Sequence, residues 1–207
     1  MSTAEQPAAD VFHGGFPDPV FDAQSVFRSI MDALARPGTI AKFSATAMPP
    51  DPLSPTIGSI AATLFDHDTR IWLDAVLARN DEICGWLSFH TSAPISNQTL
   101  DADFAIISDA GSLPSLESFS QGSQEYPDRS TTMILQVPDL DGGRELELSG
   151  PGIRTSVRVT PRGLPEHFIE QWALNRTRFP RGVDMLLAAP EGVIALPRTV
   201  KISVKEP

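Results

Sequence analysis

The stretch 183–204 reads VDMLLAAPEGVIALPRTVKISV and contains three apolar runs separated by tight links. The runs cover residues 183–188, 193–196 and 199–204, and each is predicted to form a short strand. Strands joined by tight links run antiparallel to each other. We therefore expect the C-terminal part of the chain to form antiparallel sheet.

Before this stretch, strand patterns alternate with helical patterns. Strand patterns are found at residues 39–43, 70–74, 104–108, 131–137, 144–148 and 153–159. Helical patterns follow Asp22, Ser54, Asn80 and Pro165, with a shorter one at 113–119. Alternation early in the chain and strands late predict an α/β fold in which a mixed sheet is flanked by helices.

The first helix has an apolar stripe that predicts its buried face. Phe27, Ile30, Met31 and Leu34 recur at i, i+3, i+4 and i+7 after Asp22, which is a good N-cap residue. Residues 1–19 lie before this helix, are rich in Ala, Pro, Gly and Asp, and have no period. They are predicted to be a flexible N-terminal arm, and residues 20–207 a single α/β domain.

The composition limits the classes of partner and compartment. The formal net charge is -10, so the average field of the protein repels nucleic acid and anionic membrane surfaces. No apolar run is long enough to span a membrane, and the N-terminus has no signal-peptide pattern. We expect a cytoplasmic protein without nucleic-acid or membrane partners.

The cysteine and histidine content argues against a metal site. Cys84 is the single cysteine, which excludes an internal disulfide and any cage built from several thiolates. It is interpreted as a structural thiol. The four histidines are scattered without a metal-binding spacing, so no metal is expected. Phosphate-binding, nucleophile-elbow and zinc-protease motifs are also missing from the sequence.

His90 is a candidate functional residue because it continues the apolar stripe of the helix after Asn80. The stripe contains Ile83, Trp86 and Leu87 before His90. At the end of a helix a protonated imidazole interacts favourably with the helix dipole and can titrate or bind an anion. The alternative is a capping or core histidine hydrogen-bonded to a backbone carbonyl.

Arginine dominates the basic residues, which indicates either bidentate binding of carboxylates and phosphates or only a compositional bias toward arginine. Only three of the sixteen basic residues are lysines, namely Lys42, Lys201 and Lys205. Arg176, Arg178 and Arg181 lie within six residues and could clamp a triphosphate, or could satisfy the carbonyls of a solvated helix end. Arg198 lies at a strand junction, where an arginine more often packs or forms an interface than binds a ligand.

An ordered set of short segments resembles the H subunit of bacterial carbon–phosphorus lyase, the PhnH family, from about Phe21 to Val204. The most informative segments are Asp22-Ala23-Gln24, Arg36-Pro37-Gly38, Asp66-His67-Asp68-Thr69, Phe89-His90-Thr91, Ile134-Leu135-Gln136-Val137, Gly142-Gly143-Arg144, Leu148-Ser149-Gly150-Pro151-Gly152-Ile153, Gly182-Val183-Asp184 and Pro197-Arg198-Thr199. Each is weak alone, but their order along the chain is specific.

The resemblance implies a role in phosphonate catabolism. It implies a homodimer that joins the G, I and J subunits in a core complex. That complex displaces adenine from ATP with a phosphonate to give a ribose 1-phosphonate 5-triphosphate. It also implies a fold similar to that of pyridoxal-phosphate-dependent transferases. The family has no assigned catalytic residue to place on this chain.

The sequence itself argues against a cofactor in this chain. A pyridoxal enzyme needs a Schiff-base lysine, normally in the middle of its fold, whereas Lys42, Lys201 and Lys205 lie near the ends of the chain. Without a cysteine cluster, iron–sulfur radical chemistry also belongs to another subunit. We therefore expect no cofactor, and a component of an enzyme complex that is inactive alone.

Three functions remain in competition. The first is an assembly subunit without chemistry of its own, which is preferred. The second is a subunit that contributes ligand-binding residues to the synthase site. The third is a stand-alone enzyme unrelated to phosphonates. The ligand-binding candidates for the second function are His90, Thr91, Arg28, Arg144, Arg181 and Arg198.

Overall fold

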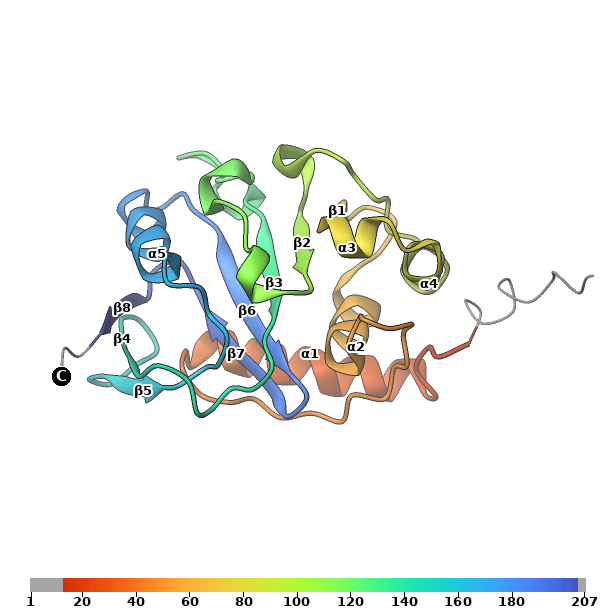
Figure 1. Cartoon of the computed structure of the whole chain (residues 1–207), viewed down its shortest axis with the longest axis horizontal. Coiled ribbons are helices and arrows are strands. Elements are labelled where there is room, and N and C mark those ends of the chain that lie inside the picture. The colour runs from red at the N-terminus through yellow and green to blue at the C-terminus, as the bar shows by residue number, and fades with distance from the viewer. Residues whose placement is uncertain (1–12, 205–207) are drawn as a thin grey trace, which may run out of the picture.

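The computed structural model describes residues 13–204, and Figure 1 shows the arrangement of their helices and strands. The helices are α1 (Pro19–Ala35), α2 (Pro55–Leu64), α3 (Ala75–Ala78), α4 (Asp81–Thr91) and α5 (Phe168–Thr177). The strands are β1 (Ile71–Leu73), β2 (Phe104–Ile107), β3 (Thr132–Gln136), β4 (Leu146–Ser149), β5 (Val157–Val159), β6 (Asp184–Ala189), β7 (Gly192–Leu196) and β8 (Lys201–Val204). Short 3₁₀ turns include η3 (Ala110–Ser112), η4 (Leu116–Ser118) and η5 (Pro127–Arg129).

The strands form two sheets. The larger sheet has the order β1-β2-β3-β6-β7, and the smaller one has the order β5-β4-β8. Strands β1, β2, β3 and β6 are parallel, and β7 is antiparallel to β6. The predicted α/β fold with a mixed sheet is therefore confirmed. The last predicted strand, β8, pairs antiparallel with β4 in the smaller sheet and does not continue the larger one.

The central strands are apolar on both faces. Ile106, Ile134 and Leu186 are neighbours in register across β2, β3 and β6, and they belong to the core cluster formed with α1, α2 and α4. The residues that follow them, Ile107, Leu135 and Leu187, form the next row across the sheet and belong to the core cluster of the opposite face. Because side chains alternate along a strand, unbroken apolar runs require cover on both sides of the sheet.

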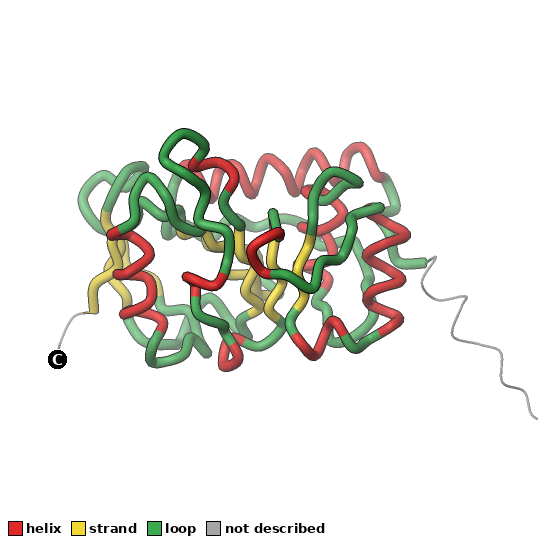
Figure 2. The backbone as a smooth tube through the Cα atoms, turned by 90° about the horizontal axis from the view of Figure 1, so that it is seen from above, coloured by secondary structure: helices red, strands yellow, loops and turns green. Residues whose placement is uncertain are grey.

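Helices and 3₁₀ turns supply that cover. Figure 2 shows the long helix α1 along one side of the central strands and shorter helices along the other. On the second side, Phe168 and Trp172 of α5 are fully buried, and the indole Nε1 of Trp172 donates to the carbonyl of Val200 at 2.9 Å. This bond ties α5 to the segment that leads into the smaller sheet.

The first helix begins earlier than predicted, and its buried face agrees with the predicted stripe only at Ile30, which is buried, and Leu34, which packs against the core. Asp18 is its N-cap, with Pro19 in the first turn, and Asp22 lies inside the helix with its carboxylate accepting from the N–H of Asp18. The buried residues are Val26, Ile30 and Ala33. The predicted members Phe27 and Met31 are 46% and 39% exposed. The prediction followed the largest apolar side chains, whereas the helix packs through a narrower strip that includes a small alanine.

Two further predictions were wrong in detail. Residues 39–43 form no strand, because Ala41 alone pairs with Val193 in an isolated bridge. Residues 113–119 form no α-helix; the turn η3 ends before this range, and only the short turn η4 lies within it. Pro114 lies between these turns, and a proline disfavours helical geometry in the residue before it. The helices capped by Ser54 and Asn80 are confirmed, and both caps accept backbone hydrogen bonds.

The predicted arm of residues 1–19 lies partly outside the described residues, which begin at His13. Within the described part, the N–H of Met48 donates to the carbonyl of Gly14 at 2.7 Å. Phe16 packs against the core cluster on the α1 side of the sheet. Residues 14–16 therefore lie against the domain, and the division into arm and domain stays a prediction.

Truncation of a buried side chain in the central strand β3 tests the two-sided core. We expect Ile134→Ala to lower the free energy of unfolding by about 2–5 kcal/mol, because Ile134 is fully buried and its removal leaves a cavity. Leu100→Ala is the control, since Leu100 is 67% exposed and should change stability by less than about 0.5 kcal/mol. Urea unfolding followed by circular dichroism measures both. Equal losses of unfolding free energy in Ile134→Ala and Leu100→Ala would contradict a core that covers both faces of the sheet.

Candidate functional site

Arg198 has the most extensive polar contacts of the predicted site residues. Its Nε donates a hydrogen bond to the Asp184 carboxylate at 3.1 Å, and its Nη2 donates to the other oxygen of the same carboxylate. The second Nη2 bond reaches the hydroxyl of Ser130 at 2.6 Å. Nη1 donates to the carbonyls of Pro127 at 2.8 Å and Pro180 at 3.3 Å. All five guanidinium donors are thus used within the chain.

This network joins segments that are distant in sequence. Asp184 begins β6, Pro127 begins η5, Ser130 precedes β3, and Pro180 follows α5. The Arg198 side chain is 12% exposed and that of Asp184 is 22% exposed, so the ion pair is largely shielded from water. In this arrangement Arg198 acts as a packing residue and has no donor left for a phosphate.

Asn175 and Gly182 reinforce the same region. The buried side chain of Asn175 donates to the carbonyl of Val183 and accepts from its N–H, both at 2.9 Å. Gly182 has a φ of +127°, and a Cβ at this position would lie 2.9 Å from the Asn175 amide oxygen. The loop after α5 is therefore held on both sides, by Asn175 and by Arg198.

His90 lies at the opposite end of the molecule, in the last turn of α4 (Figure 1). Its Nε2 is 3.2 Å from the carbonyl oxygen of His13, which also accepts from the indole Nε1 of Trp86 at 3.0 Å. The imidazole lies 4.7 Å from the Trp86 ring and against Gly15, where a Cβ would be 2.7 Å from the ring. His90 thus contacts a backbone carbonyl, as one of the two interpretations expected.

Thr91 stabilises the end of the same helix. Its hydroxyl donates to the carbonyl of Leu87 at 2.6 Å and accepts from the N–H of Ala93 at 3.1 Å. The side chain is buried, with the residue only 7% exposed. Both hydrogen bonds are local, so Thr91 ends α4 and directs the chain away from it.

The remaining candidates are exposed and lie on separate elements. Arg28 lies on α1, Arg144 precedes β4, and Arg181 follows α5. Arg144 lines a cleft with Leu164 and Phe168. Figure 1 places α4 at one end of the molecule and α5 with β4 at the other, so the six candidates do not converge on one site.

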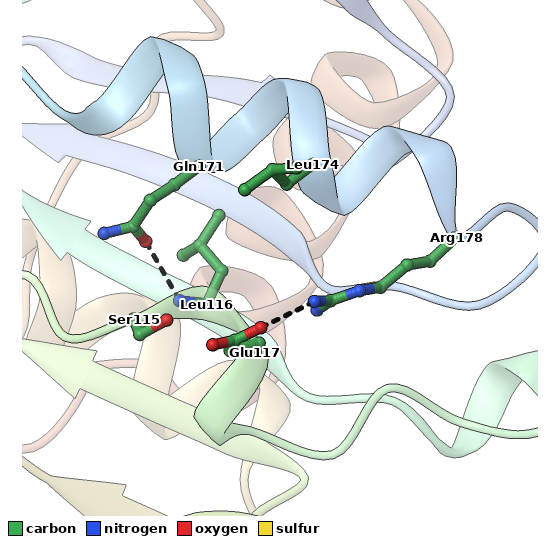
Figure 3. A pocket seen from close by; sticks show the side chains of 6 residues that line it. All are labelled: Ser115, Leu116, Glu117, Gln171, Leu174 and Arg178. Atoms are coloured by element: carbon green, nitrogen blue, oxygen red, sulfur yellow. Dashed lines mark hydrogen bonds and ion pairs between the residues drawn. The ribbon is translucent and has the colours of Figure 1, made fainter.

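Arg178 forms an ion pair that no sequence pattern predicted. Figure 3 shows it reaching from the end of α5 to Glu117, with its Nη2 2.8 Å from the carboxylate. The same pocket contains Gln171, whose amide oxygen accepts from the N–H of Leu116 at 3.0 Å. Arg178 therefore fastens α5 to η4, and Arg176 and Arg181 remain outside this contact.

Sequence reasoning missed the polar residues at the carboxyl ends of the parallel strands, where ligands bind in many open α/β sheets. Asp74 follows β1, is 5% exposed, and accepts from Val76 and Leu77 and from both the N–H and the hydroxyl of Ser108. Gln136 ends β3 and bonds to the backbone of Ser54 and Pro52. A polar residue that ends an apolar strand is the signal that could have identified them.

These residues stabilise loops at the edge of the sheet. Ser108, Asp109 and Gln136 also line an open pocket there. Asp74 and Gln136 are engaged in local hydrogen bonds, and among the residues that line this pocket Asp109 is the one with a charged side chain. The edge thus has acceptors where a phosphate group would need donors.

The comparison with protein families identifies the chain. The family model described as bacterial phosphonate metabolism protein (PhnH) matches residues 14–203. This chain belongs to the PhnH family. Its membership confirms the resemblance drawn from the sequence segments.

Two curated relatives of this PhnH-family chain are informative. The first is the alpha-D-ribose 1-methylphosphonate 5-triphosphate synthase subunit PhnH of Rhizobium meliloti (strain 1021), 45% identical over 194 residues that cover 94% of this chain and 96% of the relative. The second is HtxG of Stutzerimonas stutzeri, whose name places it among C-P lyase subunits. It is 26% identical over 183 residues, covering 88% of this chain and 86% of the relative.

The described part of this PhnH-family chain contains neither a membrane-spanning helix nor a cluster of metal-binding side chains. Among residues 13–204, no helix is both long and apolar enough to cross a membrane. Within the same range, no group of three or more His, Cys, Asp or Glu side chains is arranged to hold a metal ion.

Loss of the Arg198 network should destabilise the domain. We expect Arg198→Ala to lower the free energy of unfolding by about 3–5 kcal/mol, because it leaves the shielded Asp184 carboxylate without its partner. Arg198→Lys should lose less, since it keeps the charge but not the planar fork. The control is Arg36→Ala, whose exposed ion pair with Asp32 should contribute less than about 1 kcal/mol. The free energies of unfolding are measured by urea titration. Equal losses in Arg36→Ala and Arg198→Ala would contradict this role of Arg198.

Cys84 should react slowly with alkylating reagents. Burial, and then the nearby charge of Asp81, raise the pKa of the Cys84 thiol, so less thiolate is present at pH 8. We expect iodoacetamide to modify the folded chain more slowly than the chain in urea, and Asp81→Asn to react faster than the native chain. Mass spectrometry of timed samples gives the rates. A folded thiol that reacts as fast as the unfolded one would refute this expectation.

Proposed function

We propose that this chain is a non-autonomous subunit of the carbon–phosphorus lyase core complex. In this proposal it supports the synthase step that displaces adenine from ATP with a phosphonate. The observation that carries the proposal is the 45% identity, over nearly the full length of both chains, to a named subunit of ribose 1-methylphosphonate 5-triphosphate synthase. The match covers 94% of this chain and 96% of the relative.

The geometry of the predicted ligand residues favours a supporting role over a catalytic one. Binding of the ATP triphosphate and of a phosphonate needs several cationic donors directed at one point. Arg198 uses its donors on Asp184, Ser130 and two prolines, and His90 lies at the other end of the molecule. This separation supports a chain that works through its contacts with other subunits.

The finer parts of the proposal concern partners, compartment and fold relationship. We propose that the chain forms a homodimer, joins the G, I and J subunits, and works in the cytoplasm without a cofactor of its own. We also propose that its mixed sheet is related to that of pyridoxal-phosphate-dependent transferases. The parallel order β1-β2-β3-β6 with helices on both faces is compatible with that relationship.

A second candidate function is a direct contribution of binding residues to the synthase site. It is favoured by one observation, the exposure of Arg28, Arg144 and Arg181. No ion pair among residues 13–204 includes any of these three arginines. They could therefore face a ligand held mainly by another subunit.

Reconstitution separates the two functions. Adenine release from ATP and methylphosphonate is measured with the G, I and J subunits, using the native chain, His90→Ala, Arg144→Ala and Arg181→Ala. For a supporting role we expect activity per assembled complex to stay within about twofold for every variant, and no release by the isolated chain. A loss of tenfold or more in an intact complex would assign the substituted residue to the site. Turnover by the isolated chain would overturn the proposal.

A further inference from the structure

Two aromatic–proline pairs are fixed by the same nitrogen of Arg198. Its Nη1 donates to the carbonyl of Pro127 at 2.8 Å and to that of Pro180 at 3.3 Å. Tyr126 precedes the first proline and Phe179 precedes the second. The side chains of these aromatic residues are not buried, since Tyr126 is 53% exposed and Phe179 is 61% exposed. A shielded guanidinium therefore holds two exposed aromatic residues in one region of the surface.

Arginines accompany both aromatic rings. The guanidinium of Arg129 lies over the Tyr126 ring, 4.3 Å from its centre. Phe179 lines an open pocket together with Arg176, Pro151 and Thr199. Arg181 directly follows Pro180 and is exposed. We call this set the aromatic–arginine face, and its members are Tyr126, Arg129, Arg176, Phe179 and Arg181.

The backbone beneath this face is held by several hydrogen bonds. The N–H of Tyr126 donates to the Ser123 hydroxyl at 3.0 Å, and the N–H of Ser123 donates to the carbonyl of Tyr126 at 3.1 Å. On the Phe179 side, the bonds of Asn175 to Val183 hold the chain after the loop. Fixed anchors lose less conformational entropy on binding, which favours affinity.

The composition of the face is typical of protein interfaces. Tyrosine, phenylalanine and arginine are enriched at such interfaces, and tyrosine and arginine are frequent hot-spot residues. An aromatic ring exposed to water gains free energy when a partner covers it, because its apolar area leaves the solvent. The composition of the face therefore favours contact with a protein partner over exposure to water.

Charge indicates the chemistry of that partner. The chain has a formal net charge of -10, yet Arg176 and Arg181 take part in no ion pair within residues 13–204. The nearest carboxylate in sequence to Arg181 is Asp184, which pairs with Arg198, and Glu125 and Asp128 lie near Tyr126 on the other loop. The Phe179 side of the face thus has two exposed arginines without an intramolecular carboxylate partner among residues 13–204.

A second copy of this chain fits the face less well. If two copies met through the same face about a twofold axis, their arginines would oppose one another. If the face met a different surface of another copy, the contact would build a ring or an open chain of copies in place of the proposed homodimer. A different protein with acidic residues avoids both problems.

We propose that the aromatic–arginine face docks an acidic segment of another protein chain, with an apolar side chain of that segment against Phe179. The inference rests on the proposed function, in which the chain works inside a complex of several subunits. Phe179 supplies the apolar contact, and Arg176 and Arg181 pair with the carboxylates of the segment.

The test compares the assembly of the full-length chain with variants of this face. Three forms of the chain are compared: the native chain, Phe179→Ala, and the double variant Arg176→Glu with Arg181→Glu. Each is mixed with the purified G, I and J subunits, and biolayer interferometry gives the dissociation constant of that form for the subunits. Leu100→Ala, an exposed apolar side chain elsewhere, is the control for Phe179→Ala. Arg70→Glu with Arg79→Glu, two exposed arginines away from the face, is the control for the charge reversal.

We expect each face variant to weaken binding at least tenfold, while both controls stay within threefold of the native chain. Raising the salt concentration should weaken the native complex more than the charge-reversed one, because the arginine pairs are screened. Circular dichroism and thermal unfolding of each variant confirm that the fold is kept, as the substituted side chains are exposed.

Three results would overturn the inference, and each is distinguishable from failure of the proposed function. If the native chain binds the subunits and the face variants bind equally well, docking occurs elsewhere and the proposed function survives. If the face variants change only the self-association of the isolated chain in sedimentation, the face is a contact between copies. If the variants assemble normally but lose binding of free inorganic phosphate, the face is a small-anion site. If the native chain binds none of the subunits, the proposed function itself fails.

Discussion

The fold depends on the burial of β3 between β2 and β6 with apolar side chains on both faces. Rows of residues such as Ile106, Ile134 and Leu186 lie in register across these strands, and the following residues form an equivalent row on the opposite face. A parallel sheet of this kind is stable only when both faces are covered. The positions of α1 and α2 on one face and α5 on the other follow from that requirement.

A second constraint operates at the surface end of the sheet, where Arg198 joins β6, η5 and the loop after α5. Its partners are a carboxylate, a hydroxyl and two carbonyls. These groups come from segments that are distant in the sequence and meet only in the folded chain. Polar groups shielded from water must be satisfied, so the network specifies how these segments meet. Arg198 was a ligand candidate in the sequence, but its position at a strand junction already favoured packing, and its contacts agree with the packing interpretation.

Membership of the PhnH family and the geometry of the site lead to the same view of the chain. Among the described residues, the predicted ligand side chains stabilise helix ends or loops, or lie apart on the surface. The exposed aromatic and arginine residues gather where Arg198 holds two loops together. A subunit that acts through contacts needs such fixed surfaces more than it needs a catalytic pocket, because affinity depends on pre-organised anchors.

The sequence by itself determined the α/β class, the strands of the central sheet, and the helices capped by Ser54 and Asn80, since apolar period and capping chemistry are local properties. It also led to the family through short ordered segments. Only the tertiary structure decided which face of α1 is buried, that residues 39–43 form a single bridge, and that β8 belongs to the second sheet. It also decided that Arg198 is a packing residue. These features depend on contacts between segments that are distant in the sequence, such as Ala41 with Val193 and Arg198 with Pro127. No local pattern records which distant partner a side chain will meet.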